Sequence, residues 1–548
     1  MAVVKLSYSS VMLYRCLFVV FGSAERQLPK SCEENDLMNK RTLRRLISAF
    51  AALVIGLSVL TGCGTKTAEN VEKQEDAQTI QVYLWTNNLY ETYAPYIQSQ
   101  LPDVNIEFIV GNNDLDFYKF LQENVFHTLD ATAAVKNLTL AGSMTVTQPN
   151  PGVAGTLAIY NNGAALTGVT NTATVTYSAD KTNSTSGYLG GLVGQDKAGS
   201  TYTDCHNTGM FNIPGSGRTM FIGGIVGGAL INTKGSLTNC SNSGKFEFNF
   251  SNKPDSGMFG GLVGSAEKAF WNFTDCTNEG NFSVTFADPG HQYHSLGGIL
   301  GNGYGTFVRC INKGDITFGT AKGTNYRRTG GIIGCVGAND DAIDFQRTLS
   351  MSDCRNEGDL AASTASLGGI IGIAEKIDTP AVIENCENKG HISSPSMADY
   401  DVYYFGGIAG KVNGAFTLRN CVNRGNLTAA VERDIAGIAV SGGNDAVFEN
   451  CENYGNITVA PNHKPNEGDR WRPCVAGIVA IENDVATTIT NCTSDCVIDA
   501  TVYRATSIDK VYVFQKTWEN GTEDTKTVCD EASKSNSAGT TINITTRE

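Results

Sequence analysis

The pattern of apolar and small residues repeats along residues 126–500 with a period of roughly 35 residues. One element of the repeat is an apolar residue, two glycines, two aliphatic residues and a third glycine, as in Leu189–Gly194. The first glycines of the pairs are Gly190, Gly223, Gly260, Gly297, Gly330, Gly368 and Gly406, and the element decays to Ala-Gly at Ala436 and Ala476. Such regular recurrence predicts structural units that stack on their neighbours.

A second element reads Cys-x-Asn-x-Gly-x-apolar. Its nine cysteines are Cys205, Cys240, Cys276, Cys310, Cys354, Cys386, Cys421, Cys451 and Cys492. Asparagine stands two positions after the first eight cysteines, at Asn207, Asn242, Asn278, Asn312, Asn356, Asn388, Asn423 and Asn453. In two degenerate upstream copies Leu138 and Val169 occupy the cysteine position. This replacement indicates an apolar interior position rather than a ligand.

Each repeat predicts about three short strands separated by glycine or asparagine corners. One turn cannot bury its apolar face, whereas stacked turns bury a continuous column. We therefore predict an all-β protein, a right-handed parallel β-solenoid of about eleven turns over residues 126–500. The asparagines can form an internal amide ladder. Glycine is expected at corners with positive φ, and the glycine pair where a side chain would clash.

These two elements resemble the GLUG-type repeats of bacterial surface proteins, which are common in gut Bacteroidetes. The resemblance covers about 370 residues through its recurring motif. Relatives of this kind include adhesin-like proteins and segments of immunoglobulin-cleaving peptidases. The resemblance implies a β-solenoid at the cell surface and implies no defined ligand.

Residues 38–62 resemble a bacterial lipoprotein signal peptide. A basic start at Met38–Arg45 precedes an apolar run to Leu60, which ends in the lipobox Leu60-Thr61-Gly62-Cys63. The resemblance implies that Cys63 carries a diacylglyceryl group and becomes the N-terminus. The alternatives are an ordinary signal or a membrane span, for which the run is short. Residues 63–78 are polar and predict a flexible tether. Residues 1–37 lie upstream of this signal, and we interpret them as an extension from a mis-assigned start site or, alternatively, as a genuine cytoplasmic extension.

Residues 79–125 predict the order β-α-β-α, with strands at 79–85 and 104–110 and helices at 87–101 and 114–124. Together with the signal, they resemble the opening of extracellular sugar-type solute-binding proteins. The resemblance ends near residue 124, so it implies no binding cleft, and we interpret the segment as a fragment joined near residue 125. In residues 501–548 we expect a cap strand at 511–514 and a disordered polar tail.

Composition and charge narrow the chemistry. The net charge of −14 disfavours nucleic-acid binding, which needs a basic face. Of 16 cysteines, the nine repeat copies are expected to be buried small residues, and the better disulfide candidates are Cys335, Cys474, Cys496 and Cys529. His291 and His294 near Asp288 have only weak zinc-like spacing, so no metal or cofactor is predicted. Asp204, Asp275 and Asp353 precede repeat cysteines, but Asn and Arg replace them elsewhere, so no acidic stripe is expected.

The sequence therefore predicts a non-catalytic, extracytoplasmic lipoprotein at the cell surface, serving adhesion, glycan contact or spacing. Its expected partners are the membrane, through the lipid, and glycans or surface proteins. Aromatic residues in the loops could stack on sugars; these are Tyr293, Tyr326, Tyr400, Tyr403 and Trp471. The alternatives are a sugar receptor of a transporter, from residues 79–125, and a polysaccharide-degrading β-helix enzyme.

Overall fold

The structure is a computed structural model of the 548-residue chain. It describes residues 3–7, 15–17, 79–84, 105–110, 128–146, 152–177, 186–214, 219–250, 256–286, 293–319, 327–337, 345–363, 366–394, 404–430, 434–461, 474–482, 485–503, 507–514 and 526–546. The chain divides into two compact units: residues 1–127 with 132–134, and residues 128–131 with 135–548. Each unit is described by itself below.

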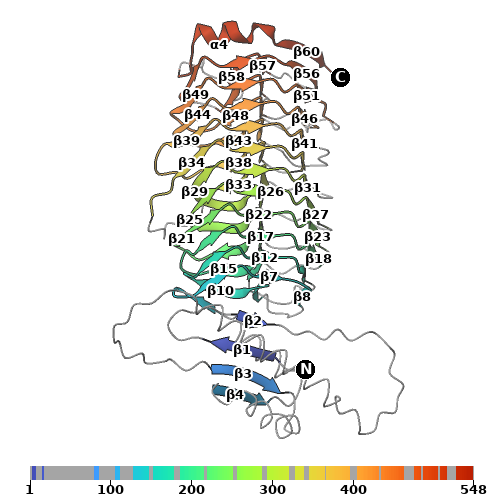
Figure 1. The fold of residues 1–548 in the computed structure, drawn as a ribbon. Coiled ribbons are helices and arrows are strands. Elements are labelled where there is room, and N and C mark those ends of the chain that lie inside the picture. The colour runs from blue at the N-terminus through green and yellow to red at the C-terminus, as the bar shows by residue number, and fades with distance from the viewer. Residues whose placement is uncertain are drawn as a thin grey trace, which may run out of the picture. The chain divides into compact units, whose positions relative to one another are not determined.

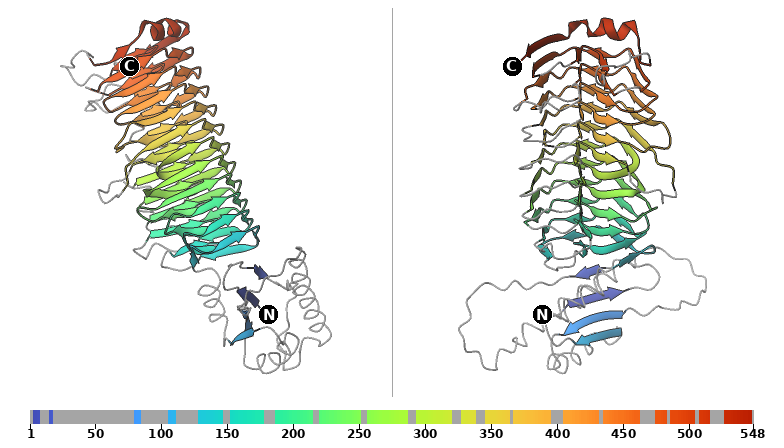
Figure 2. Two further views of the ribbon diagram at one scale, coloured as in Figure 1. Left: turned by 60° about the vertical axis from the view of Figure 1, so that its left-hand side comes forward. Right: turned by 180° about the vertical axis from the view of Figure 1, so that it is seen from behind.

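The second unit is a parallel β-solenoid, in which every turn stacks on the turn before it (Figures 1 and 2). One turn shows the plan, and its strands define four sheets. Sheet 1 contains β14 (Ser186–Gly190), and sheet 2 contains both β15 (Val193–Asp196) and β16 (Thr201–Thr203). Sheet 3 contains β17 (His206–Asn207), and sheet 4 contains β18 (Phe211–Ile213). The next strand, β19 (Thr219–Gly223), pairs in parallel with β14 and so begins the following turn.

A turn thus has five short strands in four sheets, where the sequence predicted about three strands. Sheet 3 has 11 strands, from β7 (Thr139–Leu140) to β55 (Thr493–Ser494). Nine of them begin directly after a repeat cysteine, and the other two follow Leu138 and Val169. Sheets 1, 2 and 4 contain 11, 22 and 12 strands. The strand number per turn was missed because two-residue strands and the bend within sheet 2 are too short to give a periodic pattern.

The interior is a continuous column of apolar side chains. The apolar residue six positions after each repeat cysteine is at most 2% exposed in every copy, from Phe211 to Ile498. Equivalent rings stack between turns: Phe246 lies 5.1 Å from Phe211 and 4.1 Å from Phe282, measured between ring centroids. Stacking of like residues in register buries each apolar face that a single turn would expose to water.

The N-terminal unit contains a four-stranded sheet with the order β2-β1-β3-β4. Its strands are β1 (Val3–Ser7), β2 (Arg15–Leu17), β3 (Thr79–Leu84) and β4 (Asn105–Val110). The strands β3 and β4 lie where the sequence predicted them and pair in parallel, as a β-α-β unit requires. The expected helices at 87–101 and 114–124, the signal at 38–62, Cys63 and the tether at 63–78 lie outside the described residues.

The C-terminal end corrects one expectation. The strand β58 (Tyr512–Phe514) lies where the sequence predicted a strand, and it pairs with β53 (Val479–Ile481) in sheet 2 as part of the last turn. The C-terminal cap consists of α4 (Glu531–Asn536), the 3-10 helix η1 (Ser537–Gly539) and β60 (Thr541–Thr546). The prediction of a disordered tail was wrong over residues 526–546. Its polar composition is explained by side chains that bond the open backbone of the last turn: Ser533 Oγ accepts from Cys492 N, and Ser537 Oγ from Ser494 N.

Candidate functional site

The repeat asparagines form a continuous internal ladder in sheet 3. Each side-chain Nδ2 donates to the Oδ1 of the asparagine in the next turn, at 2.6 to 2.8 Å from Asn171 through Asn453. The same Nδ2 also donates to the carbonyl oxygen two residues later, as Asn278 does to Gly280 at 3.0 Å. The ladder ends where Asn453 donates to Cys496 Sγ at 3.4 Å. These fully buried amides satisfy one another and the corner backbone.

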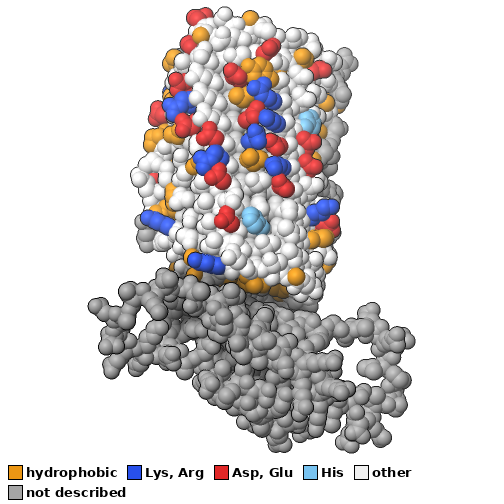
Figure 3. Space-filling model, viewed as in Figure 1, with side chains coloured by type: hydrophobic (Ala, Val, Ile, Leu, Met, Phe, Trp, Pro, Cys, Tyr) orange, Lys and Arg blue, Asp and Glu red, His pale blue; other side chains and the backbone are white. Residues whose placement is uncertain are grey.

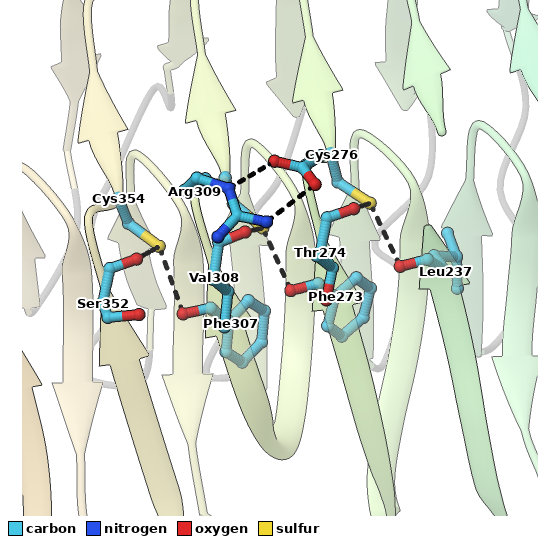
Figure 4. Close-up of polar contacts among 11 residues, drawn as sticks. Leu237, Phe273, Thr274, Cys276, Phe307, Val308, Arg309, Ser352 and Cys354 are labelled. Atoms are coloured by element: carbon cyan, nitrogen blue, oxygen red, sulfur yellow. Dashed lines mark hydrogen bonds and ion pairs between the residues drawn. The ribbon is translucent and has the colours of Figure 1, made fainter. Parts of the chain in front are cut away.

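The repeat cysteines form a second buried file, at most 1% exposed. Each thiol lies near backbone carbonyls; Cys276 Sγ is 3.5 Å from Leu237 O in the preceding turn and 3.4 Å from Thr274 O (Figure 4). None of the 13 cysteines from Cys205 to Cys529 is in a disulfide. The disulfide candidates Cys335, Cys474, Cys496 and Cys529 therefore form no disulfide with one another or with a repeat cysteine.

The positive-φ corner of each turn lies at the residue before the cysteine, and Asn, Asp or Arg occupies it rather than glycine. These residues have φ between 51° and 56°, from Asp204 to Asn491. Asparagine and aspartate tolerate this conformation better than other residues with a side chain. The motif glycines serve a steric purpose instead: a methyl group on Gly190 would overlap Val193 O, and one on Gly209 would overlap Ala173 O. The glycine pair was thus predicted correctly. Glycine does take positive φ at corners such as Gly168 and Gly199, but not at the corner before the repeat cysteines.

The corner side chains form an exposed polar ladder beside the cysteines. Arg309 donates to both carboxylate oxygens of Asp275, at 2.6 and 2.8 Å (Figure 4). Asn239 donates to Asp204 at 2.6 Å, and Asn385 to Asp353 at 3.2 Å. Acidic and basic side chains also alternate over the face shown in Figure 3. Ion pairs bridge successive turns, as Lys313 and Glu279 do at 2.8 Å. The three aspartates are therefore used in turn-to-turn contacts.

The outer faces of sheets 1 and 2 converge, and we call this junction the groove. On the sheet 1 side, the groove is lined by the residue two positions before the first glycine of each pair. These residues are Tyr188, Phe221, Met258, Ser295, Arg328, Ser366 and Tyr404. On the sheet 2 side, it is lined by the residue five positions after that first glycine. These residues are Gln195, Gly228, Ser265, Asn302, Cys335, Ile373 and Lys411. Contacts cross between the two sides, since Lys411 Nζ lies 4.1 Å from the centroid of the Tyr404 ring.

The groove is filled to different extents along its length. Toward the C-terminal end an apolar cluster, including Val440, Cys474 and Val513, packs against Tyr404. Toward the N-terminal end Tyr188 stacks on Phe221 with 4.6 Å between ring centroids. Between these parts lies a pocket of about 190 Å³.

The pocket is bounded by strands of three successive turns, and Glu375 and Lys376 line it from the turn that follows. Sheet 1 contributes residues of β24 (Ser256–Gly260), β28 (Tyr293–Gly297) and β32 (Arg327–Gly330). Sheet 2 contributes residues of β25 (Val263–Thr274), β29 (Leu300–Val308) and β33 (Ile333–Val336). The lining residues are Ser256, Met258, Glu267, Tyr293, Asn302, Arg328, Cys335, Gly337, Glu375 and Lys376. The pocket therefore combines an aromatic ring, two carboxylates, two cations and an amide.

Two contacts define its polar wall. Arg328 Nη2 donates to Glu375 Oε1 at 2.9 Å, and this ion pair is largely shielded from solvent. The same guanidinium lies 5.7 Å from the centroid of the Tyr293 ring, which is 39% exposed. Burial raises the pKa of the Cys335 thiol to about 11, so the thiol is uncharged near neutral pH.

Of the aromatic residues predicted to contact glycans, Tyr293 lies at this pocket. Tyr326, Tyr400, Tyr403 and Trp471 lie outside the described residues. Sequence reasoning missed Arg328, Asn302 and Glu375. A signal for the first two was present, because the positions two before and five after the first glycine vary in chemistry from turn to turn.

Of the three residues with weak zinc-like spacing, the structure describes only His294. His294 is fully buried in the solenoid, and burial together with the charge of Arg327 holds its pKa well below the ordinary value of 6.5. His291 and Asp288 lie outside the described residues. No cluster of three or more His, Cys, Asp or Glu side chains suited to a metal ion occurs within the described ranges.

No protein-family model, curated protein or solved structure matches this chain. Within the part of the chain that the structure describes, no helix is long and apolar enough to cross a membrane. The geometry of the groove is therefore the basis on which a function can be argued.

Proposed function

We propose that this protein is a lipid-anchored, extracytoplasmic solenoid that displays the groove for non-catalytic contact with glycans at the cell surface. The lipid would be attached at Cys63, and the solenoid would carry GLUG-type repeats as a rigid scaffold. Its partners would be the membrane, through the lipid, and glycans of host or bacterial surfaces.

The observation that carries the proposal is the central pocket, where the exposed Tyr293 ring lies beside polar groups on a rigid support. Aromatic rings bind the apolar faces of sugars, and the surrounding side chains can bond their hydroxyls. The support is rigid because the asparagine ladder and the stacked core tie each turn to its neighbours. Sites on such elements keep their geometry better than sites on loops.

Lipid attachment is tested in a bacterial host that expresses the full chain. Metabolic labelling with an alkyne fatty acid should mark the wild-type protein and fail to mark Cys63→Ala. Protease shaving of intact cells should remove the solenoid. Labelling of both proteins, or complete protection from protease, would refute the anchored and surface-displayed parts of the proposal.

Glycan contact is tested with the same full-length protein, purified in detergent, on a glycan array. We expect binding to a subset of neutral glycans and no release of reducing ends from a polysaccharide panel. Release of reducing ends would instead favour the β-helix enzyme. Tight binding of a free small sugar that is lost on disrupting residues 79–110 would favour the transport receptor, whose structural support is the parallel pair of β3 and β4.

A further inference from the structure

We propose that the central pocket binds a single neutral, hydroxyl-rich sugar residue, with Asn302 Oδ1 as a hydrogen-bond acceptor for one of its hydroxyls. This inference rests on the proposed function and assigns its site and ligand class. Three features support it: an unsatisfied acceptor, the charge balance of the lining and the size of the pocket.

The first observation is the state of the Asn302 side chain. The residue is 3% exposed and lines the pocket, yet its Oδ1 accepts no hydrogen bond from any described residue. Its neighbours in the sheet 2 file are Ser265 and Cys335, one turn to either side. A buried acceptor without a donor is unfavourable, so a donor brought in by a ligand is favoured.

The ladder asparagines show why this acceptor is unusual. Asn278 belongs to the same residue type and is also buried, and its Oδ1 accepts from Asn242 Nδ2 at 2.8 Å. Every such acceptor from Asn207 to Asn453 is satisfied by the preceding turn. Asn302 instead belongs to the sheet 2 side of the groove and lines the pocket.

The second observation is the charge of the lining. Glu267 and Glu375 are balanced by Arg328 and Lys376, and no formal charge is left over. The Arg328–Glu375 pair is already formed at 2.9 Å, so a charged ligand would have to compete with it. Hydroxyl groups can both donate to carboxylates and accept from guanidinium without breaking the pair. The lining therefore favours a neutral ligand rich in hydroxyls.

The third observation is size and shape. A volume of about 190 Å³ is below the roughly 300 to 1,000 Å³ of pockets that enclose drug-sized ligands. It suits one sugar residue, with the rest of a glycan in solvent. Tyr293 and Met258 supply the apolar surface on which the C–H face of such a ring can rest.

The test is binding to the full-length protein by saturation-transfer NMR and calorimetry, with methyl glycosides of galactose, glucose, mannose and fucose as neutral probes. Galacturonic acid and glucosamine serve as anionic and cationic probes. We expect at least one neutral glycoside to bind, with the charged probes weaker. Asn302→Leu and Tyr293→Ala should each weaken its binding at least tenfold, whereas Asn302→Asp keeps the acceptor and should lose less.

The matched control is Tyr454→Ala. Tyr454 is 38% exposed on sheet 3 and lies 5.0 Å from the Arg424 guanidinium, so it resembles Tyr293 outside the groove. This variant should bind as the wild type does, and thermal melts of all variants identify any loss of folding.

If an array glycan still binds equally well to Asn302→Leu and Tyr293→Ala, the pocket assignment is overturned and the proposed function stands. If no glycan binds the wild type at all, glycan contact itself fails. Tighter binding of either charged probe would overturn the assignment of a neutral ligand.

Discussion

Each asparagine within the ladder accepts a hydrogen bond from the preceding turn and donates one to the next. The replacement Asn278→Asp should therefore cause a large, pH-dependent loss of stability. The Asn278 side chain accepts from Asn242 at 2.8 Å and donates to Asn312 at 2.8 Å and to Gly280 O at 3.0 Å. A carboxylate keeps the accepted bond and loses both donated bonds. At about 1 kcal/mol each, these losses destabilise the fold by about 2 kcal/mol.

The buried charge adds to this cost above the pKa of the new carboxyl group. Asn278 is fully buried, and no cation bonds it, so burial should raise the pKa of an aspartate there by about 3 units above about 3.9. A raised folded-state pKa means that the unfolded state loses its proton first, so stability falls as pH rises from about 4 to about 7. The added loss is about 4 kcal/mol at neutral pH, giving about 6 kcal/mol in total.

Urea unfolding followed by circular dichroism at both pH values measures this effect relative to the wild type. The matched control is Asn281→Asp, three positions away, where the exposed asparagine Oδ1 accepts from Asp315 N at 2.9 Å and a carboxylate can do the same. We expect the control to change stability by less than about 0.5 kcal/mol. The reasoning is refuted if Asn278→Asp is as stable as this control at neutral pH, or if its loss does not shrink at about pH 4.

Three further outcomes follow from the packing. Gly261→Ala should lower the free energy of unfolding in urea by more than about 3 kcal/mol, because the added methyl group overlaps Gly298 O. The control Gly319→Ala has no neighbour within 4 Å of the added methyl group and should change stability by less than about 0.5 kcal/mol. Equal losses would contradict the steric role of the glycine pair. Because burial depresses the pKa of His294, stability should fall as pH drops below 6.5, by up to about 1.4 kcal/mol per pH unit, and His294→Leu should flatten that slope. Asp530 caps α4, so Asp530→Ala should cost about 1 kcal/mol and speed hydrogen exchange in the C-terminal cap; unchanged exchange there would argue against the cap.

The sequence by itself determined the interior of the solenoid. In a parallel stack each residue pairs with its equivalent one repeat later, so a period in the sequence becomes a file in space. The replacement of cysteine by Leu138 and Val169 was enough to place the thiols inside. The amide ladder also followed, since equivalent asparagines in successive turns come within bonding distance of one another.

Only the tertiary structure decided the groove and the cap. The pocket depends on how the outer faces of sheets 1 and 2 converge at the glycine pair. The angle between these two sheets does not change the spacing of apolar residues, so the sequence pattern does not reveal it. Arg328 meets Glu375, 47 residues later, because Glu375 follows β38 (Ile371–Ala374), the sheet 2 strand of the next turn. The polar C-terminal cap was hidden for a related reason: its serines look like those of a disordered tail until the last turn presents them with open backbone groups to bond.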